Sequence, residues 1–313
     1  MLSRVADNLF WMGRYIERTE HLARFTRIQY FYSLDGPLAR QWDTVLQSII
    51  GMTGLEWDAS TPLAEADVLY AMALDGKRPE SILYSVIRAR ENARGTRDLL
   101  SKELWENINK YYHFVHNYPV EVFKSRGLHE FTLRVIEQCS IIRGSVDNTL
   151  LHDEVWTFIK LGSYLERAVQ VARILETKFR DLETYDGPES LQKAVENYQL
   201  STMLGSTEAF DMSRRYFQAP PSREQVLEFL VLNQDFPRSI VNCLTHVETY
   251  IHKLSPTKVP DKDSVAFFVS KLVSRFRFLT GQEVFGDALG FMQQTVQDIY
   301  AIGEKLNDTY LKY

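Results

Sequence analysis

The feature that most constrains this fold is a pair of matching segments that begin 149 positions apart. Residues 13–24 read GRYIERTEHLAR and residues 162–173 read GSYLERAVQVAR. The two segments share Gly, Tyr, Glu, Arg, Ala and Arg at the same positions, without a gap. An internal repeat of this kind predicts two homologous halves, at approximately residues 1–125 and 150–313, within one domain that covers residues 1–313.

Two further matches support the repeat. VLYAMALDGKRPESI (68–82) corresponds to VLEFLVLNQDFPRSI (226–240), and LQSIIGMTG (46–54) corresponds more weakly to LSTMLGSTE (200–208). The offset rises along the chain from 149 through 154 to 158, as small loop insertions would produce. Duplicated halves usually pack about an approximate two-fold axis, so we expect the repeated residues to meet at the interface between the halves.

Helical periodicity extends along the whole chain. Apolar residues between Val5 and Tyr30 recur at spacings of three and four, which is typical of a helix, and no convincing period-two strand is present. Further helices are expected at approximately residues 39–53, 63–75, 80–116, 120–148, 152–183, 189–216, 222–232, 237–254, 263–280 and 283–311. Segments such as LDGPL, LDGKRP, YDGPES, QAPPS and LSPTKVPDKD separate them. The pattern predicts an all-α helical bundle with the two Glu-Arg helices at its centre, because both are apolar nearly all round.

The Glu-Arg pairs place charges inside these apolar helices. Adjacent helical residues point about 100° apart, so Glu17 and Arg18 cannot pair with each other. Glu17 has Arg14 and His21 within one turn, whereas the Glu-Arg pair at 166–167 has no charged neighbour at that spacing. An unpaired buried charge is costly. We therefore predict reciprocal pairing across the pseudo-two-fold axis, Glu17 with Arg167 and Glu166 with Arg18.

Other charged residues are candidates to join these pairs, and three roles remain open for the cluster. It is a structural network of Glu17, Arg18, Glu91, Glu166 and Arg167 that fixes the packing of the halves, or a pocket in which arginines bind a carboxylate or phosphate, or a catalytic site. The candidate ligand-binding residues are Arg18, Arg24, Arg90, Arg94, Arg167 and Arg173. The candidate acids or bases are Glu17 and Glu166, although no catalytic residue is assigned.

Composition and missing motifs narrow the function. The formal net charge of -5 argues against a nucleic-acid binder, and the absence of a signal peptide and of a membrane-length apolar run predicts a cytoplasmic protein with no membrane partner. Cys139 and Cys243 fit buried free thiols. His113 and His116 lie one turn apart but lack a third ligand, so no metal site is expected. No P-loop or Gly-x-Gly-x-x-Gly pattern is present, and no cofactor is expected.

Two local patterns have plain structural readings. His152, Asp153 and Glu154 precede the second Glu-Arg helix, where acidic side chains cap a helix start. The segment VAFFVSKLVSRFRFL (265–279) is amphipathic and basic on its polar side, which would suit a membrane surface, but a helix that faces the core is the preferred interpretation.

With both Glu-Arg segments in view, the chain resembles the alpha-E family, a bacterial all-helical domain named for its Glu-Arg motif. The similarity includes MLSRVADNLFWMGRYIERTEHLAR, RARENARGTRDLLSKELWENIN, RGSVDNTLLHDEVWTFIKLGSYLERA and DFPRSI. It carries over to Glu17, Arg18, Arg90, Glu91, Asn92, Arg94, Arg143, Asp147, Glu166 and Arg167. FDMSRRYF departs from the fuller Tyr-Arg-Arg-Arg run of the family, which weakens any role for Arg214 and Arg215.

The resemblance implies a context more than a reaction. Members of the family are typically encoded beside, or fused to, a circularly permuted ATP-grasp protein of the carboxylate-amine ligase type, often with a transglutaminase-like peptidase nearby. This implies a system for peptide or amide synthesis or modification. The resulting expectation is a non-catalytic partner of the ligase that binds substrate or orders the complex. An enzyme in its own right and a purely structural scaffold remain the alternatives.

Overall fold

A computed structural model describes residues 1–34, 42–58, 61–255 and 261–312, and these residues form helices and connecting segments without a strand. The predicted all-α class is confirmed. The helices are α1 (Ser3–Leu34), α2 (Trp42–Thr53), α3 (Glu65–Ala73), α4 (Ile82–Gly95), α5 (Lys102–His116), α6 (Val120–Val122), α7 (Leu128–Thr149), α8 (Glu154–Glu183), α9 (Glu189–Ser206), α10 (Phe210–Phe217), α11 (Arg223–Leu227), α12 (Ile240–Leu254), α13 (Val265–Phe278), α14 (Gly281–Phe285) and α15 (Ala288–Leu306).

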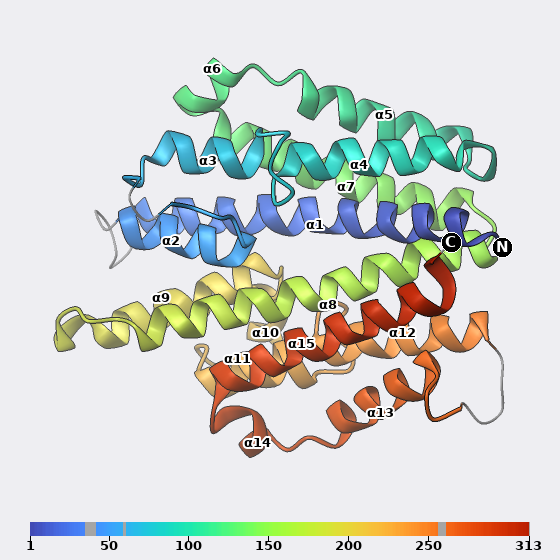
Figure 1. Ribbon diagram of the computed structural model, residues 1–313. Coiled ribbons are helices and arrows are strands. Elements are labelled where there is room, and N and C mark those ends of the chain that lie inside the picture. The colour runs from blue at the N-terminus through green and yellow to red at the C-terminus, as the bar shows by residue number, and fades with distance from the viewer. Residues whose placement is uncertain (35–41, 59–60, 256–260, 313) are drawn as a thin grey trace.

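The two Glu-Arg helices, α1 and α8, lie side by side and parallel in the middle of the bundle (Figure 1). The helices from α2 to α7 gather around α1, and those from α9 to α15 gather around α8 (Figure 1). α1 packs against α4 and α7, while α8 packs against α12 and α15. α2 and α9 each contact both central helices. The predicted central position of the Glu-Arg helices is therefore confirmed.

Two glycines allow α1 and α8 to approach closely. A Cβ atom added at Gly13 would lie 2.2 Å from the carbonyl oxygen of Ile159, and one at Gly162 would lie 2.0 Å from the carbonyl oxygen of Phe10. Both distances are far below van der Waals contact, so the backbones meet where neither residue has a side chain. The contact brings the Glu-Arg pairs, one turn further along each helix, within reach of each other.

Side-chain caps explain several helix starts. Asp153 accepts hydrogen bonds from the backbone N–H groups of Val155 and Trp156, which confirms the predicted cap of α8. Ser81 and Ser239, at matching positions of the second repeated segment, cap α4 and α12 in the same way. The repeated Pro-x-Ser-Ile sequence thus begins a helix in both halves.

Three predicted helices are wrong in their continuity, because each contains a break. The segment at 80–116 divides into α4, a 3-10 turn (Arg97–Leu99) and α5, which Ser101 caps. The segment at 189–216 divides into α9 and α10, with Glu208 between them at a φ of 56°. The segment at 283–311 divides into α14 and α15, whose start Asp287 caps. At these points local caps and turns end a helix although the apolar pattern continues.

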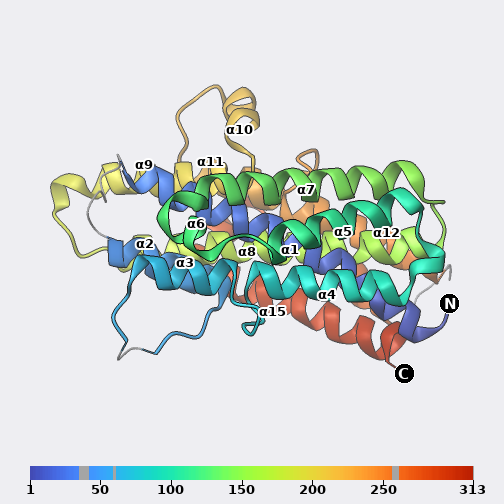
Figure 2. The same cartoon turned by 90° about the horizontal axis from the view of Figure 1, so that it is seen from above.

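The other segments follow the expected helices more closely. α7 and α11 adjoin π-helical turns (Phe123–Gly127 and Glu228–Leu232), and α15 continues into another (Asn307–Leu311). The start of the helix expected at 39–53, most of LDGPL and part of LSPTKVPDKD lie outside the described residues. Figure 2 shows α10 projecting from one side of the bundle.

The remaining structural expectations concern α13 and the thiols. α13 buries Val265, Val269, Val273 and Phe276 and packs against α12 and α15, so the core-facing interpretation is confirmed. Both cysteines are buried free thiols, as expected. No helix in the described part of the chain is long and apolar enough to cross a membrane.

Candidate functional site

The two Glu-Arg pairs meet across the contact between α1 and α8. Arg167 donates from Nε and Nη2 to the two carboxylate oxygens of Glu17, at 2.6 and 3.0 Å. Arg18 donates in the same way to Glu166, at 2.7 and 3.2 Å. Both pairs are bidentate, the strongest arrangement for a guanidinium and a carboxylate. The predicted reciprocal pairing is confirmed.

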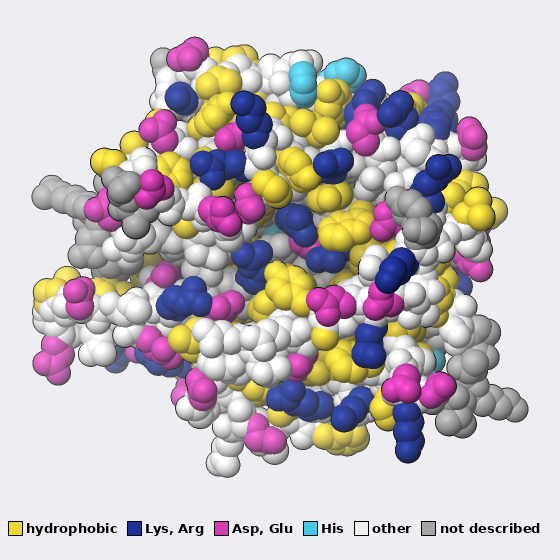
Figure 3. Space-filling model, in the orientation of Figure 1, with side chains coloured by type: hydrophobic (Ala, Val, Ile, Leu, Met, Phe, Trp, Pro, Cys, Tyr) yellow, Lys and Arg dark blue, Asp and Glu magenta, His cyan; other side chains and the backbone are white. Residues whose placement is uncertain are grey.

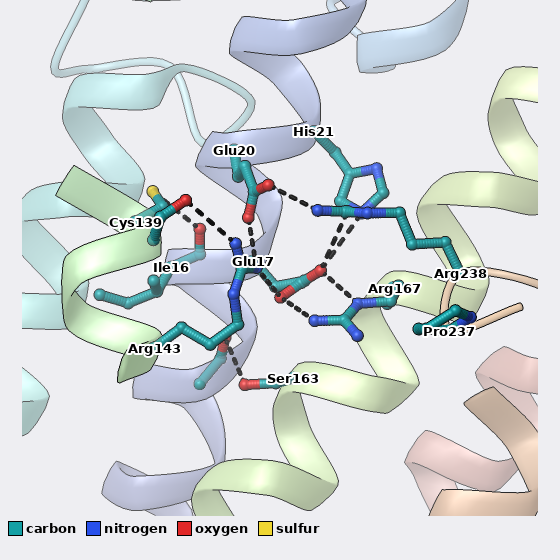
Figure 4. Close-up of polar contacts among 12 residues, drawn as sticks. Ile16, Glu17, Glu20, His21, Cys139, Arg143, Ser163, Arg167, Pro237 and Arg238 are labelled. Carbon is teal, nitrogen blue, oxygen red and sulfur yellow. Dashed lines mark hydrogen bonds and ion pairs between the residues drawn. The ribbon is translucent and has the colours of Figure 1, made fainter. Parts of the chain in front are cut away.

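Around Glu17 the pair extends into a larger cluster (Figure 4). Glu20, one turn along α1, accepts from Arg143 of α7 at 2.5 Å and from Arg238, which directly precedes the cap of α12, at 2.7 Å. Arg143 also lies 3.5 Å from Glu17, and Arg238 lies 3.8 Å from it. Four helices or helix starts therefore supply charges to one buried cluster.

Glu208 brings a third carboxylate to this cluster from the turn between α9 and α10. Its two oxygens lie 2.8 Å from Arg24 and 2.7 Å from Arg238. Arg24 also donates to Glu20 at 2.9 Å. Glu208 has a left-handed backbone, which is unfavourable for a residue with a side chain, and the two ion pairs offset that strain.

The cluster around Glu166 is smaller. Arg14 donates from Nε to Glu166 at 2.7 Å, and Gln170 donates to its other oxygen at 2.8 Å. Together with Arg18, these residues enclose a carboxylate with no exposed surface. The sequence spacing places Arg14 within one turn of Glu17, but Arg14 pairs with Glu166 across the interface instead.

The cluster residues are unequal in charge. Apart from His21, the Glu17 cluster has three carboxylates and four guanidinium groups, and the Glu166 cluster has one carboxylate and two guanidinium groups; together they form the network of Glu17, Glu20, Glu208, Arg24, Arg143, Arg167 and Arg238 with Glu166, Arg14 and Arg18. With His21 neutral, two positive charges are left without a carboxylate. An excess of this kind in a buried setting favours the binding of an anion.

The carboxylates are held in their ionised form. Burial alone would raise the pKa of Glu17, Glu20 and Glu166, but the guanidinium groups around them lower it below the ordinary value. A general acid or base works best with a pKa near the working pH. The electrostatics therefore favour charge pairing over proton transfer at Glu17 and Glu166.

His21 lies between the two kinds of charge. Its Nε2 is 3.3 Å from Glu17 and 3.3 Å from Nη1 of Arg238, and its Nδ1 is buried without a hydrogen-bond partner in the described structure. Burial lowers the pKa of His21, and the neighbouring Arg238 acts in the same direction. The ring is neutral at pH 7.

Two hollows adjoin the network. One, of about 30 Å³, lies beside Glu17, Arg143, Lys160 and Arg167, and it has room for no more than a water molecule or two. The other is an open groove of about 640 Å³ beside Arg14 and Arg18, between α1 and α15. Figure 3 shows Lys and Arg side chains along the hollow between these helices.

The remaining predicted residues lie elsewhere. Glu91 pairs with Arg90 at 3.0 Å and with Arg94 at 2.6 Å on an outer side of α4, so its predicted place in the central network is wrong. Arg90 also lies 4.6 Å from the ring centre of Tyr112. Arg173 lies against Gly54, with its Nη2 only 2.5 Å from the position of an added Cβ. Of the six predicted ligand arginines, Arg18, Arg24 and Arg167 are in the network, and their ligand role stays a prediction.

Sequence reasoning missed several members of the site. Glu20 lies one turn beyond Glu17 in the same apolar helix, and its charge there could have indicated that it joins the cluster. Arg238 stands in the matched Pro-x-Ser-Ile segment, where the first half has Glu80. Arg143 came from the resemblance alone. Glu208 gave no signal, because its role depends on a turn that the helical periodicity concealed.

The two histidines considered for metal binding have aromatic surroundings. The ring of Tyr112 lies 5.2 Å from that of His113 and 5.1 Å from that of His116. Within the described residues, no group of three His, Cys, Asp or Glu side chains is arranged to hold a metal ion.

Comparison with known proteins gives relatives of much greater length. An uncharacterized protein of Mycobacterium bovis is 27% identical over 262 residues, which are 76% of this chain but 28% of that protein. An uncharacterized protein of Mycobacterium tuberculosis strain H37Rv is 26% identical over 262 residues, with the same shares of the two chains. No solved structure matches the chain.

A family model covers nearly the whole sequence. Residues 1–311 match Alpha-E, which is described as a predicted alpha-helical domain with a conserved ER motif. The two Glu-Arg pairs at the centre of this bundle give that motif a structural position. The chain belongs to the Alpha-E family.

Proposed function

We propose that this chain is a non-catalytic, substrate-binding partner of a circularly permuted ATP-grasp carboxylate-amine ligase, in a cytoplasmic system that makes or modifies peptide or amide bonds. The observation that carries the proposal is the excess of guanidinium groups over carboxylates in the network. Such a ligase acts on carboxylates, and arginines are the side chains best suited to hold them.

The length of the relatives supports a partner. The matching segment makes up 28% of the Mycobacterium bovis protein, so a related segment there shares its chain with a much longer sequence. We infer that this chain likewise works beside a larger protein. The ATP-grasp protein, and in some systems a transglutaminase-like peptidase, are the partners that the family resemblance implies.

The alternatives fit the geometry less well. An enzyme that uses Glu17 or Glu166 as acid or base would need a carboxyl group with a pKa near neutrality, and the arginines lower both pKa values instead. A purely structural scaffold would have a dry, charge-balanced network with no cavity beside it. The groove next to Arg14 and Arg18 favours a ligand over a scaffold alone.

We also propose that the chain arose by duplication and that a pseudo-two-fold axis runs between α1 and α8. Contacts that match at the offset of 149 support this, since Gly13 meets Ile159 and Gly162 meets Phe10. The two bidentate pairs are related in the same way. Gly54 and Glu208, matched by the weaker repeat, are both left-handed, and each lies beside one of the matched arginines Arg173 and Arg24.

The test is to co-express the chain with a circularly permuted ATP-grasp protein from the same organism. We expect the two to elute as one complex in size-exclusion chromatography, and ATP turnover by the ligase on acidic peptides to rise when the chain is present. The isolated chain should turn over neither ATP nor peptide. Glu91→Gln, on the outer side of α4, is the control variant and should leave complex and turnover unchanged.

Three results would count against the proposal. Separate elution combined with unchanged ATP turnover would remove the partnership. Turnover of a peptide by the isolated chain would favour the enzyme. If Glu17→Gln and Glu166→Gln lower thermal stability but leave turnover and binding unchanged, the network is structural.

A further inference from the structure

We infer that the groove between α1 and α15 binds a short peptide in its zwitterionic form, with the carboxylate at Arg14 and Arg18 and the amino group toward Glu304 and Asp308. The inference rests on the proposed function and names the ligand class and its place. The groove has a volume of about 640 Å³ and is lined by Trp11, Arg14 and Arg18 of α1 and by Tyr300, Glu304 and Asp308 of α15 and the turn after it.

One wall of the groove presents guanidinium groups that are already held in place. Arg14 and Arg18 share the buried carboxylate of Glu166, so one negative charge serves two positive ones. Arg14 uses only its Nε in this contact, and within the described residues its terminal nitrogens make no hydrogen bond. Its side chain is only 9% exposed and stacks 4.6 Å from the ring centre of Trp11. Donors fixed in this way bind an anion without a further loss of side-chain freedom.

The opposite wall is acidic. Glu304 and Asp308 lie one turn apart, and both are exposed. Neither forms an ion pair with Arg14 or Arg18 in the described structure, and Asp308 has only an exposed contact with Lys312, at 3.6 Å. Opposite charges therefore line one groove without neutralising each other. A ligand with a charge of each sign, separated by its own length, satisfies both walls.

The size and lining of the groove favour a peptide over a single amino acid. Volumes of about 300–1,000 Å³ are typical of sites for small-molecule ligands. A single amino acid would leave most of this groove empty. The rings of Phe10, Trp11 and Tyr300 also line the groove, and they offer apolar contacts to side chains. A peptide of about three residues fits this arrangement.

The matching place in the other half is closed. The counterparts of Phe10, Trp11, Arg14 and Arg18 at the offset of 149 are Ile159, Lys160, Ser163 and Arg167. These four line the cavity of about 30 Å³, which Arg143 also borders. Of these two matched places, the groove beside Arg14 and Arg18 has room for a peptide, whereas the cavity beside Arg167 does not.

The experiment uses isothermal titration of the full chain, without any ligase, with trialanine as the probe. N-acetyl-trialanine, trialanine amide and inorganic phosphate are titrated for comparison. Trialanine should bind, and blocking either end should weaken binding by at least about tenfold, because each blocked end leaves a charged wall unpaired. Phosphate, which lacks the amino group, should bind more weakly than trialanine.

Substitutions of exposed residues test the acidic wall without disturbing the network. The double variant Glu304→Gln with Asp308→Asn should lose the preference for trialanine over its acetylated form and should keep the preference over the amide. Glu137→Gln removes an exposed carboxylate from α7, outside the groove, and should change neither preference. Arg14→Gln should abolish binding, and circular dichroism then shows whether the fold is retained.

The inference is overturned if trialanine fails to bind, if both blocked peptides bind as well as trialanine, or if the double variant keeps the full preference. Phosphate binding as tight as that of trialanine would also overturn it, in favour of a simple anion site. A complex with the ligase in the absence of peptide binding defeats this inference alone. Peptide binding by a chain that forms no ligase complex defeats the proposed function alone.

Discussion

At the scale of single residues, the decisive feature is the satisfaction of Glu166 by partners distant in sequence. Its helix offers it no charged neighbour, and that absence is what made the partner on α1 predictable from the sequence. The sequence predicted the bidentate pair of Arg18 with Glu166. It did not predict that Arg14 joins this pair, because Glu17 is closer to Arg14 in the sequence. Sequence spacing identifies which charge needs a distant partner, whereas the packing of α1 against α8 decides which partner it meets.

Removing the Glu166 carboxylate should be severely destabilising. Glu166→Gln leaves the buried Arg14 and the partly buried Arg18 without a counter-charge, and we expect a loss of about 3–5 kcal/mol in the free energy of unfolding. Glu91→Gln is the matched control, since Glu91 also pairs with two arginines but is 39% exposed, and it should lose less than about 1 kcal/mol. Urea denaturation measures both. Equal losses in the two variants would show that burial of the network adds nothing.

The two thiols should be inert while the chain is folded. Burial raises the pKa of both Cys139 and Cys243 to about 12. Only the thiolate reacts with alkylating reagents, so at pH 8 we expect no modification by iodoacetamide in the native chain and modification of both residues in urea. Mass spectrometry of the intact protein counts the adducts. Modification of the native chain at either thiol would contradict the burial described.

At the scale of helices, the sequence revealed the central pair but not where the long segments divide. The repeated Gly-x-Tyr-x-Glu-Arg pattern placed α1 and α8 together because charged residues in apolar helices need a buried partner. The division between α9 and α10 depends on the left-handed Glu208, which is stabilised by Arg24 and Arg238. A turn that is held by tertiary ion pairs has no local sequence signal, so periodicity alone predicts one continuous helix across it.

The close contact of α1 and α8 requires glycine at positions 13 and 162, and this requirement can be tested by substitution. In Gly162→Ala the new methyl group would meet the backbone oxygen of Phe10, which cannot move without separating the helices. We expect a loss of about 1–3 kcal/mol or more in the free energy of unfolding. Gly144→Ala in the middle of α7 is the control, because nothing lies within 4 Å of the added atom.

The control should change stability in the opposite direction. Alanine is favoured over glycine inside a helix, so Gly144→Ala should gain about 0.5–1 kcal/mol. Thermal melts and urea titrations of both variants give the comparison. If Gly162→Ala is as stable as Gly144→Ala, the backbones of α1 and α8 do not meet as described.

At the scale of the whole molecule, the network makes the stability of the fold depend on pH. Glu17, Glu20 and Glu166 have folded pKa values below the ordinary value, and unfolding would restore them to about 4.3. Above that pH the carboxylates are ionised in both states and the full stabilisation is present. As the pH falls below it, the unfolded chain binds protons that the folded chain does not, so stability is lost.

His21 should add a second window at higher pH. Burial and Arg238 lower its pKa, whereas Glu17 and Glu20, the other charges that face it, act against this. The unfolded chain therefore binds a proton near pH 6.5 that the folded chain refuses. Stability should fall as the pH drops from about 6.5 toward the folded pKa, by up to about 1.4 kcal/mol per pH unit, before the carboxylates begin to contribute.

A single substitution separates the two windows. Gln170 of α8 occupies the position that matches His21, and it donates to Glu166 at 2.8 Å. A glutamine at position 21 can therefore donate to Glu17 in the same way. Urea denaturation between pH 7.5 and pH 3.5 should show that His21→Gln removes the loss above about pH 5 and keeps the steep loss below it, where three protons correspond to about 4 kcal/mol per pH unit. Identical profiles for the two proteins would mean that His21 binds its proton at the same pH in the folded and unfolded chains, which would contradict the lowered pKa of the buried ring.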